Sequence, residues 1–125
     1  MEARDVMTQE VITLTPDMTV GEAADVLVRY RIHGAPVVGE DGGLIGMVSL
    51  VDLVGKPGGT VREIMTPDPI SAMEDTPLPE LAQTMIDEMV RRVPITRGRR
   101  VVGIVSASDI VRAYLGLVDE LAKAS

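Results

Sequence analysis

Apolar and polar positions follow two different spacings along this chain, and each spacing predicts one kind of element. Apolar side chains recur every three or four residues over 20–28 and 78–89, which predicts two amphipathic helices. Short apolar runs bounded by turn residues predict strands at 11–15, 35–38, 44–48, 70–73, 93–96 and 101–105. Closing helices are expected to begin near Ser49 and near Ser106. Each half of the chain is therefore predicted to have the element order β-α-β-β-α.

Local signals place the starts of the two amphipathic helices. Thr19, with Glu22 three residues later, has the pattern of a capping box. The later helix is expected to begin at Thr76-Pro77, because proline suits the first helical position.

The two halves also repeat each other in sequence. When Arg4 is laid on Arg62, the segment RDVMT at 4–8 falls on REIMT at 62–66. After one residue is dropped from a turn, GMVS at 46–49 falls on GIVS at 103–106. The joint lies in the glycine- and proline-rich stretch 55–59, which no helix or inner strand tolerates. We therefore predict an α+β fold of two repeats, 1–57 and 58–125, packed about a pseudo-twofold axis.

Composition narrows the possible chemistry. The chain has 125 residues, 46% of them hydrophobic and 25% charged, which is ordinary for a globular domain. It has no Cys and one His, which excludes disulfides, thiolate metal sites and multi-histidine metal centres. No nucleophile, base and orienting group can be named together, so we predict neither an enzyme nor a metal site. No signal peptide or bilayer-spanning stretch is encoded, so a cytoplasmic protein is expected.

Charge argues against nucleic acid and against a membrane surface as partners. Twelve Lys and Arg against nineteen Asp and Glu give a net charge of −7. Five arginines nevertheless fall within ten residues: Arg91, Arg92, Arg97, Arg99 and Arg100. The last three belong to a predicted hairpin turn and are interpreted as solvated, since no aromatic side chains accompany them for base stacking.

The most specific motif is Gly-h-h-Ser-x-x-Asp, where h is apolar, at 46–52 and again at 103–109. One interpretation is a helix cap, in which the serine oxygen and the acid bind backbone N–H groups. The other uses the same turn to grip a ribose diol and leaves helix N–H groups for phosphate. Capping alone does not explain why both copies also keep the glycine and a valine.

The tandem RDVMT…HGAPVV…GMVSLVD and REIMT…RVPI…GIVSASD resembles a pair of CBS domains over about residues 3–116. The resemblance implies the CBS-pair fold, or Bateman module. It also implies clefts between the repeats that bind adenosine-containing ligands such as AMP, ADP, ATP or S-adenosylmethionine. Modules of this family commonly form disc-like homodimers and regulate an attached or separate partner protein.

Carried over residue by residue, the resemblance places Asp52 and Asp109 on the ribose. One expected site contains Ser49, Asp52, Thr66, Ile70, Val90, Arg91 and Arg92, and the other contains Ser106, Ser108, Asp109, Thr8, Ile12, Ile32, His33 and Gly34. His33 and Arg91 match positions at which the family often contacts phosphate, although His33 alone also suits the surface end of a helix. Gly34 replaces a second basic residue, which argues against a triphosphate there. Met7 and Met65 are interpreted as packing residues.

Three functional hypotheses follow. The first is a stand-alone, non-enzymatic sensor that binds an adenine nucleotide or S-adenosylmethionine and signals to an unidentified effector protein, because the chain ends soon after its second repeat. The second is a structural or oligomerisation module without a bound nucleotide. The third, an enzyme acting on nucleotides, lacks a nameable set of catalytic residues.

Overall fold

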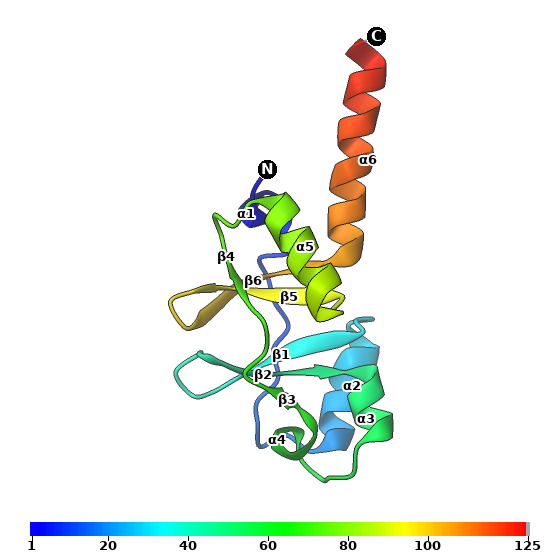
Figure 1. Ribbon diagram of the computed structural model, residues 1–125. Helices are drawn as coiled ribbons and strands as arrows, with labels where there is room; N and C mark the ends of the chain where they lie inside the picture. Colours follow the sequence, from blue (N-terminus) through cyan, green and yellow to red (C-terminus); the bar gives the residue numbers. More distant parts are fainter. Residues whose placement is uncertain (125) are drawn as a thin grey trace. The chain divides into compact units, whose positions relative to one another are not determined.

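The computed structural model describes residues 1–124, which form two compact units (Figure 1). The first unit contains residues 1–10, 71–97 and the chain from 102 onward, and the second contains 11–70 and 98–101. Each unit therefore combines segments from both halves of the sequence. The repeat boundaries at 57 and 58 stay a prediction about the sequence duplication, distinct from these spatial units.

The second unit has a three-stranded antiparallel sheet with helices beside it. Its elements are α2 (Val20–Arg29), β1 (Gly34–Val38), β2 (Leu44–Ser49), α3 (Leu50–Gly55), α4 (Val61–Ile64) and β3 (Thr66–Pro67). The strand order is β1-β2-β3, with Gly34 opposite Ser49 and Met47 opposite Thr66. Helices α2 and α3 lie side by side in this unit (Figure 1). The pairing of β2 with β3 places β3 beside the end of β2, where α3 begins.

The first unit repeats the arrangement of a three-stranded sheet with helices. Its elements are α1 (Ala3–Val6), β4 (Ala72–Met73), α5 (Leu78–Glu88), β5 (Arg92–Arg97), β6 (Arg100–Ser106), which belongs to this unit from Val102 onward, and α6 (Ala107–Ala124). The strand order is β4-β5-β6, and β4 pairs in parallel with β5. Helix α6 contacts α1 and α5, and its later turns extend beyond them (Figure 1).

Most predicted elements are confirmed, and three expectations are corrected. The strand expected at 11–15 is reduced to a single bridge between Leu14 and Val37, where Leu14 N donates to Pro36 O at 2.9 Å. The strand expected at 70–73 shortens to β4. Helix α5 begins at Leu78 with Pro77 as its N-cap, one residue later than expected. The short helices α1 and α4 have no counterpart among the predicted elements, because four residues are too few to show a periodicity.

The capping box at Thr19 is confirmed. Its hydroxyl accepts from Glu22 N at 3.1 Å, and Glu22 Oε1 accepts from Thr19 N at the same distance. The reciprocal bonds satisfy two backbone donors that a helix start would otherwise leave unpaired.

Each unit has its own aliphatic core. The core of the second unit consists of Leu14, Ala23, Leu27, Ala35, Val37, Val48, Val61 and Ile64. The core of the first consists of Ala3, Leu78, Leu81, Met85, Val93, Ile95 and Val105. Ala3 and Val61, from α1 and α4, are fully buried, so each short helix completes the core of the unit in which it lies. Among the described helices, none combines the length and apolarity that crossing a bilayer requires.

Candidate functional site

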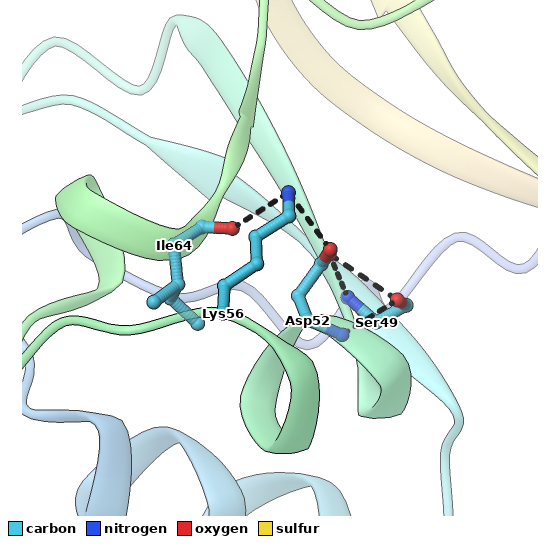
Figure 2. Close-up of polar contacts among 4 residues, drawn as sticks. All are labelled: Ser49, Asp52, Lys56 and Ile64. Atoms are coloured by element: carbon cyan, nitrogen blue, oxygen red, sulfur yellow. Dashed lines mark hydrogen bonds and ion pairs between the residues drawn. The ribbon is translucent and has the colours of Figure 1, made fainter.

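The first Ser-x-x-Asp motif caps helix α3 with a reciprocal set of hydrogen bonds (Figure 2). Ser49 N donates to Asp52 Oδ2 at 2.9 Å, and Ser49 Oγ donates to the same oxygen at 3.2 Å. In return, Asp52 N donates to Ser49 Oγ at 3.4 Å. The Asp52 side chain is only 13% exposed, so these bonds hold a mostly buried carboxylate at the start of the helix.

The other oxygen of this carboxylate binds a lysine that the sequence analysis did not single out. Lys56 Nζ lies 3.0 Å from Asp52 Oδ1 and donates to Ile64 O at 3.2 Å (Figure 2). Lys56 stands four residues after Asp52, a spacing that brings two side chains of a helix together. That spacing was the available signal for the ion pair, whereas nothing local in the sequence indicated the bond to Ile64.

The second motif caps α6 in the same way. Ser106 N donates to Asp109 Oδ2 at 2.8 Å, and Asp109 N donates to Ser106 Oγ at 3.2 Å. Ser108 Oγ lies 3.0 Å from Ser106 Oγ, which places the extra hydroxyl of this copy at the cap. Asp109 Oδ1 pairs with Arg112 at 2.6 Å, with side-chain exposures of 15% and 70%. Arg112 was also missed, although its spacing of three residues from Asp109 is typical of a helix-surface pair.

The capping interpretation is thus confirmed in both copies. It is compatible with the other interpretation, in which the same turn binds a ribose diol. A carboxylate has about four lone-pair sites. In each copy Oδ2 is used by the cap, while Oδ1 accepts from one basic side chain among the described contacts. An acceptor site on Oδ1 therefore stays open for a hydroxyl donor. That the donor is a ribose stays a prediction.

In the second unit, the structure brings three predicted segments to the start of α3. Thr66 is exposed and lies opposite Met47, two residues before Ser49. On the other side of β2, buried Gly34 lies opposite Ser49, and the carbonyl of exposed His33 accepts from Leu50 N at 3.0 Å. The resemblance assigned Thr66 to the site of Asp52, and His33 and Gly34 to the site of Asp109. Within this unit all three lie near the start of α3.

In the first unit the equivalent segments meet at the start of α6. Thr8 N donates to Ile104 O at 2.9 Å, which places this exposed threonine beside β6. Arg91 O accepts from Ala107 N at 2.7 Å. Arg92 is half-buried, and its burial, together with the charge of Arg91, lowers its pKa below the ordinary arginine value. A half-buried guanidinium beside a like charge favours a bound anion.

The remaining predicted site residues are apolar and partly accessible. Ile12, Ile32 and Val90 are half-buried, and Ile70 is exposed. Ile32 packs against the core of the second unit and Val90 against that of the first. The groupings of site residues that would draw on both units stay predictions. In the described part of the chain, no three His, Asp or Glu side chains are placed to hold a metal ion.

The glycine of each motif has a packing reason. A Cβ at Gly46 would lie 2.5 Å from Met65 Sδ and 3.1 Å from Thr66 O. A Cβ at Gly103 would overlap Met7 Sδ and would lie 2.9 Å from Met7 Cγ. The prediction that Met7 and Met65 are packing residues is confirmed. Their packing also explains the glycine of each motif, which capping alone did not explain. Each Met-Thr segment lies against its sheet because glycine leaves space for the methionine.

The hairpin arginines are exposed, as predicted. Arg97 pairs with Glu74 at 2.9 Å and is 73% exposed, and Arg99 lies 3.9 Å from Asp41 and is 75% exposed. A hydrogen bond from Gly43 N and the charge of Arg99 hold the pKa of Asp41 below its usual value. These contacts are of the solvated kind that contributes little to stability.

Comparison with known proteins places this arrangement in a family. A family model of the CBS domain matches residues 3–58 and again 61–116. The structure is similar to CBSX2, a CBS-pair protein of Arabidopsis thaliana solved in complex with AMP, with a TM-score of 0.88, 27% identity and coverage of 93% of this chain and 97% of the other. It is equally similar to the CBS domain pair of protein MJ0100, solved with 5′-methylthioadenosine and S-adenosyl-L-methionine, with a TM-score of 0.88, 33% identity and coverage of 93% and 97%.

Sequence relatives include much longer proteins. Zinc metalloprotease MJ0392 of Methanocaldococcus jannaschii is 36% identical over 123 residues, which are 97% of this chain and 35% of that protein. The chain likewise spans only 23% of two other curated relatives that it matches. The family match nevertheless covers nearly all of the present sequence, in two copies. The chain therefore belongs to the CBS-domain family and carries two CBS domains in tandem.

Proposed function

We propose that this chain is a regulatory module that binds an adenosine-containing ligand and signals the ligand-bound state to a partner protein. One observation carries the proposal: each unit holds a mostly buried, serine-capped carboxylate, Asp52 or Asp109, whose Oδ1 keeps room for a hydroxyl donor. A ribose diol offers such donors. Relatives of the same fold solved with AMP and with S-adenosylmethionine support this choice of ligand class.

The arginines favour a ligand that also carries phosphate. Arg91 and Arg92 are adjacent, and burial, with the charge of Arg91 added to it, lowers the pKa of Arg92. A phosphate would relieve this repulsion, whereas the cationic sulfonium of S-adenosylmethionine would not. We therefore propose AMP, ADP or ATP as the ligand at Arg91 and Arg92, and we keep S-adenosylmethionine as a candidate at the other site.

Regulation would work through differential affinity. A ligand shifts a conformation or an assembly only as far as it binds one state better than the other. Longer relatives, of which this chain spans 23–35%, support an effector that is attached to such a module. No catalytic role is proposed for the chain itself. Its formation of a homodimer and its cytoplasmic location stay predictions.

Calorimetric titration with AMP, ATP and S-adenosylmethionine tests the proposal. Ligand-free wild type is expected to bind at least one of them with a Kd near 1 μM, about −8 kcal/mol. Asp52→Ala and Asp109→Ala should each remove one site, and the double variant should give no binding heat. Asp41→Ala, which alters an exposed loop carboxylate, serves as the control and should bind like wild type.

A structural or oligomerisation module is the second candidate. The observation that favours it is the apolar surface of α6, where Val111, Tyr114 and Leu115 are each more than half exposed. Heat from none of the three ligands, with well-folded wild type, would contradict the sensor and favour this second function.

A further inference from the structure

Lys56 connects two parts of the second unit that are separate in sequence. Its ammonium group lies between the side chain of Asp52, in α3, and the carbonyl of Ile64, the last residue of α4 (Figure 2). Its side chain is 43% exposed, so neither contact results from deep burial of the lysine. The two bonds instead fix the position of the ammonium group.

This contact determines how Asp52 is presented. The cap holds Oδ2 through Ser49 N and Ser49 Oγ, which leaves Oδ1 to be fixed by another group. Lys56 supplies that group at 3.0 Å, and its bond to Ile64 O keeps it from swinging away. A polar group held in place before a ligand arrives loses less entropy on binding. Oδ1 still has one lone pair for the ligand.

The same contact reaches the Met-Thr segment. Ile64 is followed directly by Met65, whose side chain packs on Gly46, and by Thr66 in β3. A change in the Lys56 bonds therefore changes the restraint on the backbone of Ile64, which leads into this segment. By linkage, a ligand that depends on the contact also stabilises it.

We infer that Lys56 is a positioning residue, which holds Asp52 Oδ1 for a ligand hydroxyl and couples occupancy of this position to the Met65–Thr66 segment. The inference rests on the proposed binding of an adenosine-containing ligand at Asp52. It assigns a role that Arg112, the basic partner of Asp109, does not share, because Arg112 is 70% exposed and contacts Asp109 alone among its described partners.

The test compares variants in which only one site is left. In an Asp109→Ala background, Lys56→Met should weaken binding of AMP or ATP, whichever the background binds, about tenfold. Lys56→Arg, which keeps the charge, should stay within about threefold of the background. The matched control is Arg112→Met in an Asp52→Ala background, where a loss below about threefold is expected. Thermal unfolding of every variant checks that the fold is retained.

Hydrogen exchange gives a second readout that a merely structural lysine would not change. Adding the ligand to the Asp109→Ala protein should slow amide exchange at residues 64–66, and Lys56→Met should abolish that protection even at saturating ligand. A Lys56→Met protein that binds equally well or more tightly would overturn the inference, and so would an equal loss for Lys56→Arg.

The outcomes distinguish the proposed sensor function from the proposed role of Lys56. If wild type binds but the Asp109→Ala protein does not, Asp52 carries no site, and the inference fails while the sensor function stands. If wild type binds none of the ligands, the proposed function fails, and the inference falls with it. A loss for Arg112→Met as large as that for Lys56→Met would show that the bond to Ile64 O contributes nothing.

Discussion

Replacing Ala3 by aspartate is expected to unfold the first unit, although Ala3 lies at the start of the other half of the sequence. Ala3 is fully buried in the core that α5, β5 and β6 build. A carboxylate there would have no partner, and an unpaired buried charge costs roughly 3–5 kcal/mol. The loss should appear as fast amide exchange at Val93 and Ile95, while Val37 and Val48 keep much more of their protection.

The repeat supplies a matched variant with the opposite outcome. Val61 occupies the equivalent position in α4 and is fully buried in the core of the second unit. Val61→Asp should therefore remove protection from Val37 and Val48 first. If each sequence repeat folded by itself, the two variants would exchange their effects, with Ala3→Asp exposing Val37 and Val61→Asp exposing Val93. That result would contradict the exchange of segments between the repeats.

Backbone hydrogen bonds explain why the first ten residues belong with the second half of the chain. Ala3 N donates to Thr76 O at 2.9 Å, and Leu78 N donates to Met1 O at 2.9 Å. Thr8 and Ile104 exchange two bonds, of 2.9 and 3.1 Å. Segment 61–66 is bound to the first half of the chain in the same way: Val61 N donates to Met18 O at 2.9 Å, Arg62 N donates to Pro16 O at 3.0 Å, and Thr66 pairs with β2.

Much of this architecture could be predicted from the sequence, because it depends on local patterns. The start of α2 at Thr19 follows from a capping box, and β1 and β2 follow from apolar runs around a glycine turn. The two Ser-x-x-Asp caps were also predictable, since each uses residues only three positions apart. The repeat further indicated that the Ser-x-x-Asp motif of one half has a counterpart in the other.

What the sequence could not indicate depends on contacts between distant segments. The strand expected at 11–15 has suitable residues, yet only Leu14 is paired, with β1 as its neighbour. Lys56 stands in a glycine- and proline-rich joint that gives no sign of a bond to Ile64 O. The role of Gly46 and Gly103 required knowing which side chain lies above them.

Gly103→Ala is expected to destabilise the first unit by about 1–3 kcal/mol, the usual cost of forcing extra atoms into a packed site. The new methyl group would meet the Cγ of Met7 at 2.9 Å and its Cβ at 3.2 Å. Because these atoms are close to the backbone of Met7, the side chain cannot simply rotate away, and the Thr8–Ile104 hydrogen bonds should weaken. Urea unfolding of wild type and variant measures the loss.

A double-mutant cycle identifies the cause. Met7→Ala alone removes the methionine from above the glycine and should itself cost stability, but it leaves space for the methyl group of Gly103→Ala. The double variant should therefore be more stable than the sum of the two single losses implies, by about 1 kcal/mol or more. Strictly additive losses would mean that the methionine is not what requires glycine at this position. The same cycle with Gly46 and Met65 should show a smaller coupling, because the added methyl group would also meet the backbone oxygen of Thr66 at 3.1 Å, a contact that Met65→Ala does not remove.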